Sequence, residues 1–387
     1  MSKGFIVFMG ILFLGGSLAV LVLSDSFNSK IVYREDVVTD ASALEKEIQD
    51  NNQTLSEEVK EEVVAIAHVE TPDVMRAVYS TMWSISSKQK RDYLVGLIES
   101  TDLNSIVIDV KGSGGELVFD NVGAIEEIVR DLHKKGIYTI ARVVVFQDSG
   151  LAKTNPEFSL KNKAGNIWRD RRGFAWSDPA SVGAWDHIVG ISKRAIDLGF
   201  DEINYDYIRF PTDGDLDNIV YPAWDGVESK SDVIKRFGAY SKEKLKEYDP
   251  DVKLSLDIFG YTFLIGDGLG IGQKLPDMLD NFDYVYPMVY PSHYSTGNFG
   301  FANPAQHPYE VVNQTLQKGL ESLGERGEEA KPQIRPWIQV FDMGADYTPE
   351  MIRAQIQATY DVLGEENTGW LMWSPSNIYD EVLEIKL

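Results

Sequence analysis

The sequence predicts an α/β fold, in which a (β/α)8 TIM barrel follows a single N-terminal transmembrane helix and a stem. Eight β-rich runs alternate with helical segments over residues 72–387, and such a barrel needs roughly 250 residues or more. The 19 residues from Phe5 to Leu23 carry no charge, which is the length of a membrane-spanning helix. The chain is therefore divided into 1–25, 26–71 and 72–387.

Composition excludes several classes of protein. The 387 residues are 43% hydrophobic and 25% charged, so the chain can bury a large core and is neither disordered nor fibrous. A net charge of −23 repels phosphate backbones, and we expect no nucleic-acid partner. The chain has no cysteine, which excludes disulfides, thiolate zinc sites, iron–sulfur clusters and cysteine nucleophiles.

Residues 1–25 form the expected membrane anchor or signal sequence. The uncharged run would be about 28 Å long as a helix, close to the hydrocarbon thickness. Lys3 precedes the run and Asp25 follows it, which orients the N-terminus toward the cytoplasm. A cleaved signal peptide is the alternative, although the run ends in VLVLSDSF without a small-x-small site. We expect a single-pass cell-membrane protein with its C-terminal domain outside, or a secreted protein if the segment is cleaved.

The stem, residues 26–71, is polar and acidic. Its apolar residues have patchy helical spacing but no sustained heptad. It is expected to be either a partly helical spacer or a disordered tether.

The predicted strands are rich in β-branched and aromatic residues. They cover residues 77–85, 105–111, 138–146, 202–210, 253–259, 282–290, 333–341 and 369–374. Helical stretches between them cover 124–135, 185–198, 233–248 and 349–363. A doubly wound sheet is the alternative, but it would place a glycine-rich phosphate turn after its first strand. The glycine-rich segment 266–273 follows the fifth run and lacks that spacing, so we interpret it as a flexible loop.

Two carboxylates are the candidate catalytic residues. Asp206 ends the predicted fourth strand and Asp257 lies at the matching height on the fifth, about 4.8 Å away across neighbouring strands. Barrel chemistry takes place at the carboxyl ends of strands. Paired carboxylates can cleave a glycosidic bond, with one protonating the leaving oxygen and the other attacking or activating water. Asp257 is expected to be the proton donor, and Arg209 to keep Asp206 ionised.

Other polar and aromatic residues at strand ends are candidates for substrate binding, because sugars stack on aromatic faces and hydrogen-bond through their hydroxyls. The candidates are Asp109, Lys111, Arg142, Arg209, Asp342, Trp83, Tyr290, His293, Tyr294, Trp337 and Trp373. Trp176, Tyr205, Tyr207 and Tyr286 have similar positions, and about half of all these aromatics are expected to be barrel core.

Other chemistries are disfavoured. The five histidines form no H-x-x-x-H or H-E-x-x-H pair and there is no G-x-S-x-G, so we expect neither a zinc hydrolase nor a serine nucleophile. The acidic segment 213–218 lacks the glycine and glutamate of a calcium loop. No metal and no cofactor is expected.

Residues 72–387 contain an ordered set of seven motifs. The set consists of VIDVKGSGGELVF (107–119), NYDYIRFPTDG (204–214), LSLDIFGY (254–261), GIGQ (270–273), VYPMVYPSHY (285–294), PWIQVFD (336–342) and GWLMWSPSNIY (369–379). Together these motifs resemble the bacterial putative glycoside hydrolase domain family, which is related to the α-amylase-like barrels.

The resemblance implies roles by position. In amylase-like enzymes a nucleophile aspartate ends strand four, an acid ends strand five and a stabilising aspartate follows strand seven, which implies Asp206, Asp257 and Asp342. This chain departs from that pattern, because its acid is an aspartate and Arg209 follows the nucleophile rather than preceding it. Residues 200–208 also resemble a chitinase signature, but Ile208 replaces its terminal glutamate.

We therefore expect an extracytoplasmic glycoside hydrolase that acts on a cell-surface or environmental polysaccharide. Adjacent strands suggest a short carboxyl separation and hence retention of configuration. The alternatives are a non-catalytic carbohydrate-binding or envelope-organising barrel, or a scaffold for protein contacts. The expected partners are the polysaccharide and, through residues 5–23, the membrane.

Overall fold

Eight parallel strands close into a barrel in the computed structural model, which describes residues 9–14, 17–22, 68–366 and 368–385. The chain separates into two compact units, 1–65 and 66–387, and the barrel belongs to the second. Around the barrel its strands are β10 (Tyr284–Met288), β11 (Trp337–Gln339), β12 (Gly369–Trp373), β3 (Met75–Ser80), β4 (Ser105–Lys111), β5 (Tyr138–Val144), β7 (Glu202–Asp206) and β9 (Lys253–Phe259). The predicted (β/α)8 architecture is confirmed.

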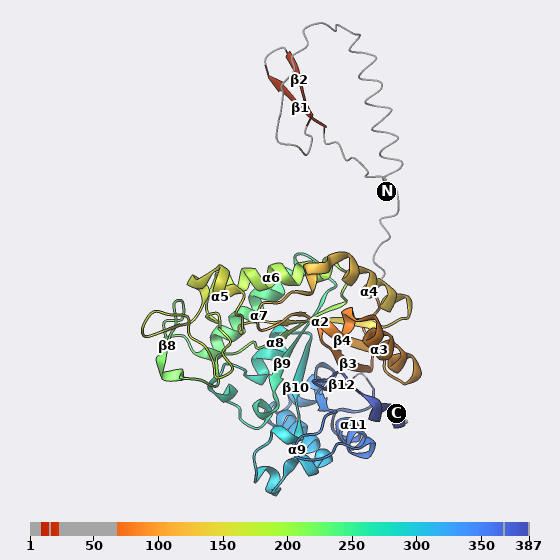
Figure 1. Ribbon diagram of the computed structural model, residues 1–387. Helices are drawn as coiled ribbons and strands as arrows, with labels where there is room; N and C mark the ends of the chain where they lie inside the picture. The colour runs from red at the N-terminus through yellow and green to blue at the C-terminus, as the bar shows by residue number, and fades with distance from the viewer. Residues whose placement is uncertain (1–8, 15–16, 23–67, 367, 386–387) are drawn as a thin grey trace. The chain divides into compact units, whose positions relative to one another are not determined.

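Helices surround the strands (Figure 1). The longer ones are α3 (Lys88–Ser100), α4 (Val122–Lys134), α6 (Val182–Asp197), α7 (Lys230–Lys246), α8 (Leu275–Asn281), α9 (Pro308–Ser322) and α11 (Pro349–Leu363), and the shorter ones are α2 (Met82–Ser86), α5 (Leu151–Thr154) and α10 (Arg326–Ala330). Helix α11 has the bounds predicted for it. The Thr348 hydroxyl caps its first turn, Pro349 opens it, and Gly364 follows it with φ 91°.

Six of the eight strands are shorter than predicted, and only β4 and β9 have the predicted bounds. Three of the six show why. The first ends at Ser80 because Thr81 caps helix α2, accepting a hydrogen bond from the Ser84 amide. The fourth ends at Asp206 because Tyr207 adopts φ 55°, which a strand does not accommodate. The seventh begins only at Trp337, after a 3-10 turn that ends at Gln333.

The N-terminal unit differs from the prediction. Within the segment 5–23, β1 (Met9–Leu14) and β2 (Ser17–Val22) pair as antiparallel strands instead of continuing one helix. Gly15 and Gly16 separate the two strands in the sequence, and glycine is a poor helix former that favours hairpin connections. No helix in the described part of the chain has the length and apolar character to cross a membrane. The rest of 1–25, and the predicted stem as far as residue 67, lie outside the described residues.

Strand register places polar side chains at one level inside the barrel. Asp109 pairs with Arg142, Arg142 with Asn204, and Asn204 with Ser255 across four neighbouring strands. Because side chains two residues apart share a face, Asp206 and Asp257 lie one step above this layer, nearer the carboxyl ends of their strands.

The loops that follow β5 and β7 are linked to each other. Strand β6 (Lys161–Asn162) in the first loop pairs antiparallel with β8 (Ile219–Val220) in the second. The loop after the strand that bears Arg142 is therefore paired with the loop after the strand that bears Asp206.

Candidate active site

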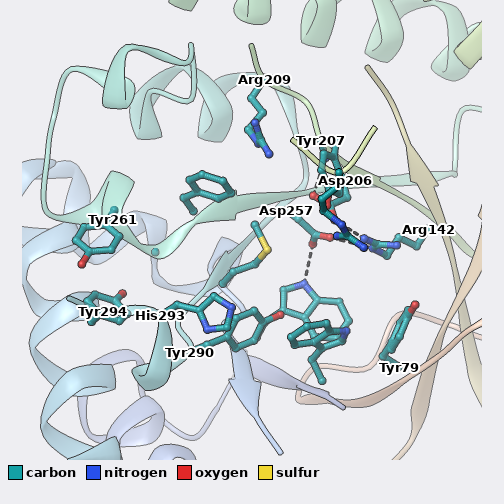
Figure 2. A pocket seen from close by; sticks show the side chains of 16 residues that line it. Tyr79, Arg142, Asp206, Tyr207, Arg209, Asp257, Tyr261, Tyr290, His293 and Tyr294 are labelled. Atoms are coloured by element: carbon teal, nitrogen blue, oxygen red, sulfur yellow. Dashed lines mark hydrogen bonds and ion pairs between the residues drawn. The ribbon is translucent and has the colours of Figure 1, made fainter. Parts of the chain in front are cut away.

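A cavity of about 570 Å³ opens at the carboxyl ends of the barrel strands. Figure 2 shows part of its lining, in which Asp206, Asp257 and Arg142 lie together and the rings of Tyr261, Tyr290, His293 and Tyr294 lie farther from Arg142. Nine of the residues predicted for catalysis or binding line it: Arg142, Asp206, Arg209, Asp257, Tyr290, His293, Tyr294, Trp337 and Trp373.

Arg142 contacts three acidic residues, two of which line the cavity. Its Nη1 atom lies 2.5 Å from the Asp109 carboxylate, Nη2 binds Asp206, and Nε lies 3.4 Å from Asp257. Burial would lower the pKa of Arg142, but the charges of Asp109 and Asp206 raise it well above its usual value. One guanidinium thus holds three carboxyl groups together at the cavity floor.

Asp257 is the most deeply buried acid of this group, with 1% of its surface exposed. Its Oδ1 atom accepts hydrogen bonds from the Trp337 indole at 2.7 Å and from the Asn204 amide at 3.2 Å. Burial, followed by the negative charge of Asp206, raises the pKa of Asp257 to about 8. The carboxyl group is therefore protonated at neutral pH, as a general acid must be.

Asp206 is the last residue of β7. Its Oδ1 atom accepts a hydrogen bond of 2.6 Å from the Tyr207 amide, and Oδ2 binds Arg142. Tyr207 has φ 55°, a left-handed conformation that is uncommon for an aromatic residue. This turn directs the chain away from the strand and leaves the Asp206 carboxylate at the cavity wall (Figure 2).

Aromatic pairs form the opposite wall. Tyr290 stacks on Trp373 with ring centroids 5.0 Å apart, and Tyr261 stacks on Tyr294 at 4.8 Å. His293 lies against Tyr290 at 5.3 Å. Flat apolar faces of this kind can stack on the C–H face of a sugar ring, and ionisable groups beside them can bind its hydroxyls.

Arg209 lines the cavity but does not pair with Asp206, contrary to the sequence prediction. Its guanidinium lies 4.9 Å from the ring centre of Trp176, 5.1 Å from that of Tyr207 and 4.8 Å from that of Phe259. The residue follows the left-handed turn at Tyr207, which carries it beyond the strand face that bears Asp206. The cation that pairs with Asp206 is Arg142 rather than the predicted Arg209.

Four predicted binding residues do not line the cavity. Asp109 lies behind Arg142 and accepts a 2.5 Å hydrogen bond from the Tyr79 hydroxyl. Lys111 is 1% exposed and pairs at 2.9 Å with Asp148, in a buried ion pair that joins the end of β4 to the loop after β5. Asp342 is exposed and accepts a hydrogen bond from the Tyr347 amide, as a loop cap does. Trp83 is 71% exposed on α2.

Three of the remaining aromatics lie in the protein interior, the position expected for about half of the set. Tyr205 and Tyr286 are fully buried, and their hydroxyls bind Ser192 and Glu202 within the protein. Trp176 is buried and donates its indole N–H to Asp170.

Sequence reasoning missed or did not assign seven lining residues. They are Tyr79, Arg172, Tyr207, Phe259, Gly260, Tyr261 and Met288. Most lie within a few residues of a strand's carboxyl end, and that position was the available signal. Arg172 had none, because it comes from the long loop after β5.

No metal site is evident among residues 68–366 and 368–385, where no three histidine or acidic side chains could hold an ion together. Asp109, Asp206 and Asp257 converge on the Arg142 guanidinium, which supplies the positive charge between them.

Fold and cavity together define a (β/α)8 barrel whose carboxyl groups and aromatic rings converge at the carboxyl ends of its strands. The chain belongs to the family described as "Putative glycosyl hydrolase domain", whose model matches residues 77–379. A comparison with curated proteins gives no match.

Solved structures of glycoside hydrolases share the fold. The PgaB (BpsB) glycoside hydrolase domain of Bordetella bronchiseptica has a TM-score of 0.57 at 14% identity, over 81% of this chain and 98% of that one. The α-galactosidase of Lactobacillus brevis has a TM-score of 0.52 at 13% identity, over 82% of this chain and 40% of that one. A hypothetical protein of Ruminiclostridium thermocellum is 31% identical over 46% of this chain and 96% of that one, with a TM-score of 0.41.

Proposed function

We propose that the barrel hydrolyses an O-glycosidic bond of a polysaccharide, using Asp206 and Asp257 as its two carboxyl groups. The observation that carries this proposal is the pair itself. One acid with a pKa of about 8 and a second acid bound to Arg142 line the same cavity, opposite stacked aromatic rings. Two carboxyl groups with different environments are what glycosidic cleavage requires.

The roles follow from those environments. Asp257, protonated at neutral pH, donates its proton to the leaving glycosidic oxygen. Asp206 acts as nucleophile or base, and Arg142 provides it with a positively charged partner. In the second half of a retaining reaction, Asp257 would accept a proton from the attacking water.

Retention of configuration is the expected stereochemistry. Asp206 and Asp257 bind different nitrogens of the same guanidinium, which favours the short separation typical of retaining enzymes, about 5–5.5 Å. Proton NMR of the first-formed sugar anomer tests this expectation directly.

The decisive experiment for the function is a panel of cell-wall and exopolysaccharides, assayed both for binding and for release of reducing ends. Release of reducing ends supports a hydrolase. Binding without release across the panel would favour the non-catalytic carbohydrate-binding barrel. Absence of both would favour the scaffold for protein contacts.

The location is proposed from hydropathy alone. The uncharged run 5–23 supports an exported barrel, held at the membrane by an anchor or released after cleavage. A full-length chain that sediments with membranes and needs detergent for release would support the anchor. A soluble form that begins near residue 25 would show cleavage.

A further inference from the structure

Arg209 is a buried cation that forms no ion pair within the described part of the chain, and the charges of Asp206, Asp213 and Asp170 act on it only at longer range. Its side chain is within a cage of three aromatic rings, and 7% of the residue's surface is exposed. Among residues 68–366 and 368–385, no carboxylate forms an ion pair with it, whereas Arg142 in the same cavity contacts three. Buried charges are normally paired, because leaving water is costly for them.

One edge of the guanidinium makes no hydrogen bond to the residues that the structure describes. The guanidinium's two hydrogen bonds, to the Phe210 carbonyl at 3.1 Å and the Thr212 hydroxyl at 3.3 Å, both come from Nη1. Nε and Nη2 have no hydrogen-bond partner within the described part of the chain. Arg209 lines the cavity, and Figure 2 shows its guanidinium directed toward the space between the labelled side chains.

This edge of the guanidinium has a definite chemical preference. Nε and Nη2 carry two parallel N–H groups, which match the two oxygens of a carboxylate in a bidentate pair. Burial lowers the pKa of Arg209, so an anion bound there would offset the cost of desolvating the charge. The aromatic cage fixes the plane of the guanidinium and so orients the pair.

A second arginine stands at the edge of the same cavity. Arg172 lines it, is exposed to solvent, and lies over the Phe174 ring at 5.5 Å. It belongs to the segment 151–176, which has six basic residues against two acidic ones in a chain whose net charge is −23. Arg172 thus adds a second positive charge at the cavity, where it would attract an anionic group.

We propose that the substrate is an acidic polysaccharide, and that Arg209 binds the carboxylate of a uronic-acid residue while Arg172 attracts the polymer to the cavity. This inference rests on the proposed glycoside hydrolase function and names the class of its substrate. Arg209 is then a specificity-determining residue, separate from the proton transfer assigned to Asp257.

The test uses matched sugars. Oligogalacturonides, oligoglucuronates and oligomannuronates are compared with the same oligosaccharides after reduction of each carboxylate to a neutral alcohol. Binding to the full-length chain is measured by calorimetry at about 0.15 M salt, where screening limits non-specific attraction. We expect at least one acidic oligosaccharide to bind about tenfold or more tightly than its neutral counterpart.

Variants locate the effect. Arg209→Gln should remove the preference for the acidic form, and Arg209→Lys should restore it only in part because lysine lacks the bidentate edge. The matched control is Arg236→Gln, since Arg236 also stacks on an aromatic ring, Trp185 at 4.7 Å, but is exposed and paired with Glu228. If Arg209→Gln does not fold, Arg172→Gln and the comparison of acidic with neutral sugars in the wild type still provide a test.

The outcomes separate the two proposals. Arg209-dependent binding of uronates without release of reducing ends would support the substrate-binding inference and overturn the hydrolase. Cleavage of neutral glycans with no advantage for the acidic forms would overturn the inference and leave the hydrolase standing. Failure of every uronate to bind, or tighter binding of sulfated oligosaccharides than of uronates, would also overturn it.

Discussion

The indole nitrogen of Trp337 donates a hydrogen bond of 2.7 Å to the carboxyl group of Asp257. The two residues come from β11 and β9, which are separated by β10, so the bond crosses the interior of the barrel. A donor aimed at this oxygen stabilises the ionised form of Asp257, whereas burial and the charge of Asp206 stabilise the protonated form. The balance leaves the pKa at about 8.

The pH profile of activity should report this balance. Asp257 must be protonated to act as acid, so turnover should be lost as pH rises through about 8. Trp337→Phe removes a bond that favours the ionised form, and should move the alkaline limb upward by about one pH unit. Trp373→Phe is the control, because Trp373 lines the cavity without a hydrogen bond to Asp257 in the described structure. If Trp337→Phe does not shift the alkaline limb of the pH profile, the proposed role of Asp257 is contradicted.

Gly115 should be intolerant of a side chain. A Cβ atom there would lie 2.4 Å from the Gly150 Cα atom, and the residue has φ +90°. Gly136 has φ +71°, and a Cβ atom added to it would meet nothing within 4 Å, so Gly136→Ala measures the backbone strain alone, about 1 kcal/mol. Gly115→Ala should lower the free energy of unfolding by about 1–3 kcal/mol more. Equal losses of unfolding free energy for Gly115→Ala and Gly136→Ala in chemical denaturation would contradict this prediction. They would show that the segments around Gly115 and Gly150 can move apart at no cost in stability.

His68 should stabilise the barrel in a pH-dependent way. It hydrogen-bonds the Asp201 carboxylate at 3.1 Å, which raises the pKa of His68 although its partial burial opposes this. A raised pKa means that the stabilisation is complete below the unfolded value, about 6.5, and is lost as pH rises through the folded value. His68→Gln should therefore destabilise the protein more at about pH 5.5 than at about pH 9. A difference in unfolding free energy that does not vary with pH would show that the His68 charge contributes nothing.

The barrel could be predicted from sequence because its strands repeat a local pattern. Runs such as 105–111 and 253–259 match β4 and β9, since buried parallel strands are continuously apolar and β-branched. Strand ends that depend on a single backbone angle, such as φ 55° at Tyr207, could not be predicted. The hydrophobic run 5–23 predicts a helix by hydropathy, yet its described residues pair as strands.

The site was predictable in its residues and less so in its pairings. Asp206 and Asp257 could be found because strand ends mark the cavity. The predicted partner of Asp206 is wrong, because proximity in sequence favours Arg209 whereas strand register brings Arg142 to it. Arg172 could not be found, since the path of the loop between β5 and α6 is set by tertiary packing.

The measurement that tests the central claim most directly is turnover by Asp206→Asn and Asp257→Asn on a polysaccharide that the wild type cleaves. Each substitution keeps the shape of the side chain, and each should reduce kcat by at least about 10³-fold, or roughly 4 kcal/mol of barrier, with folding intact by circular dichroism. Asp342→Asn is the matched control, because Asp342 is exposed and caps its own loop. Near-normal turnover by both Asp206→Asn and Asp257→Asn would contradict the assignment of these two carboxyl groups.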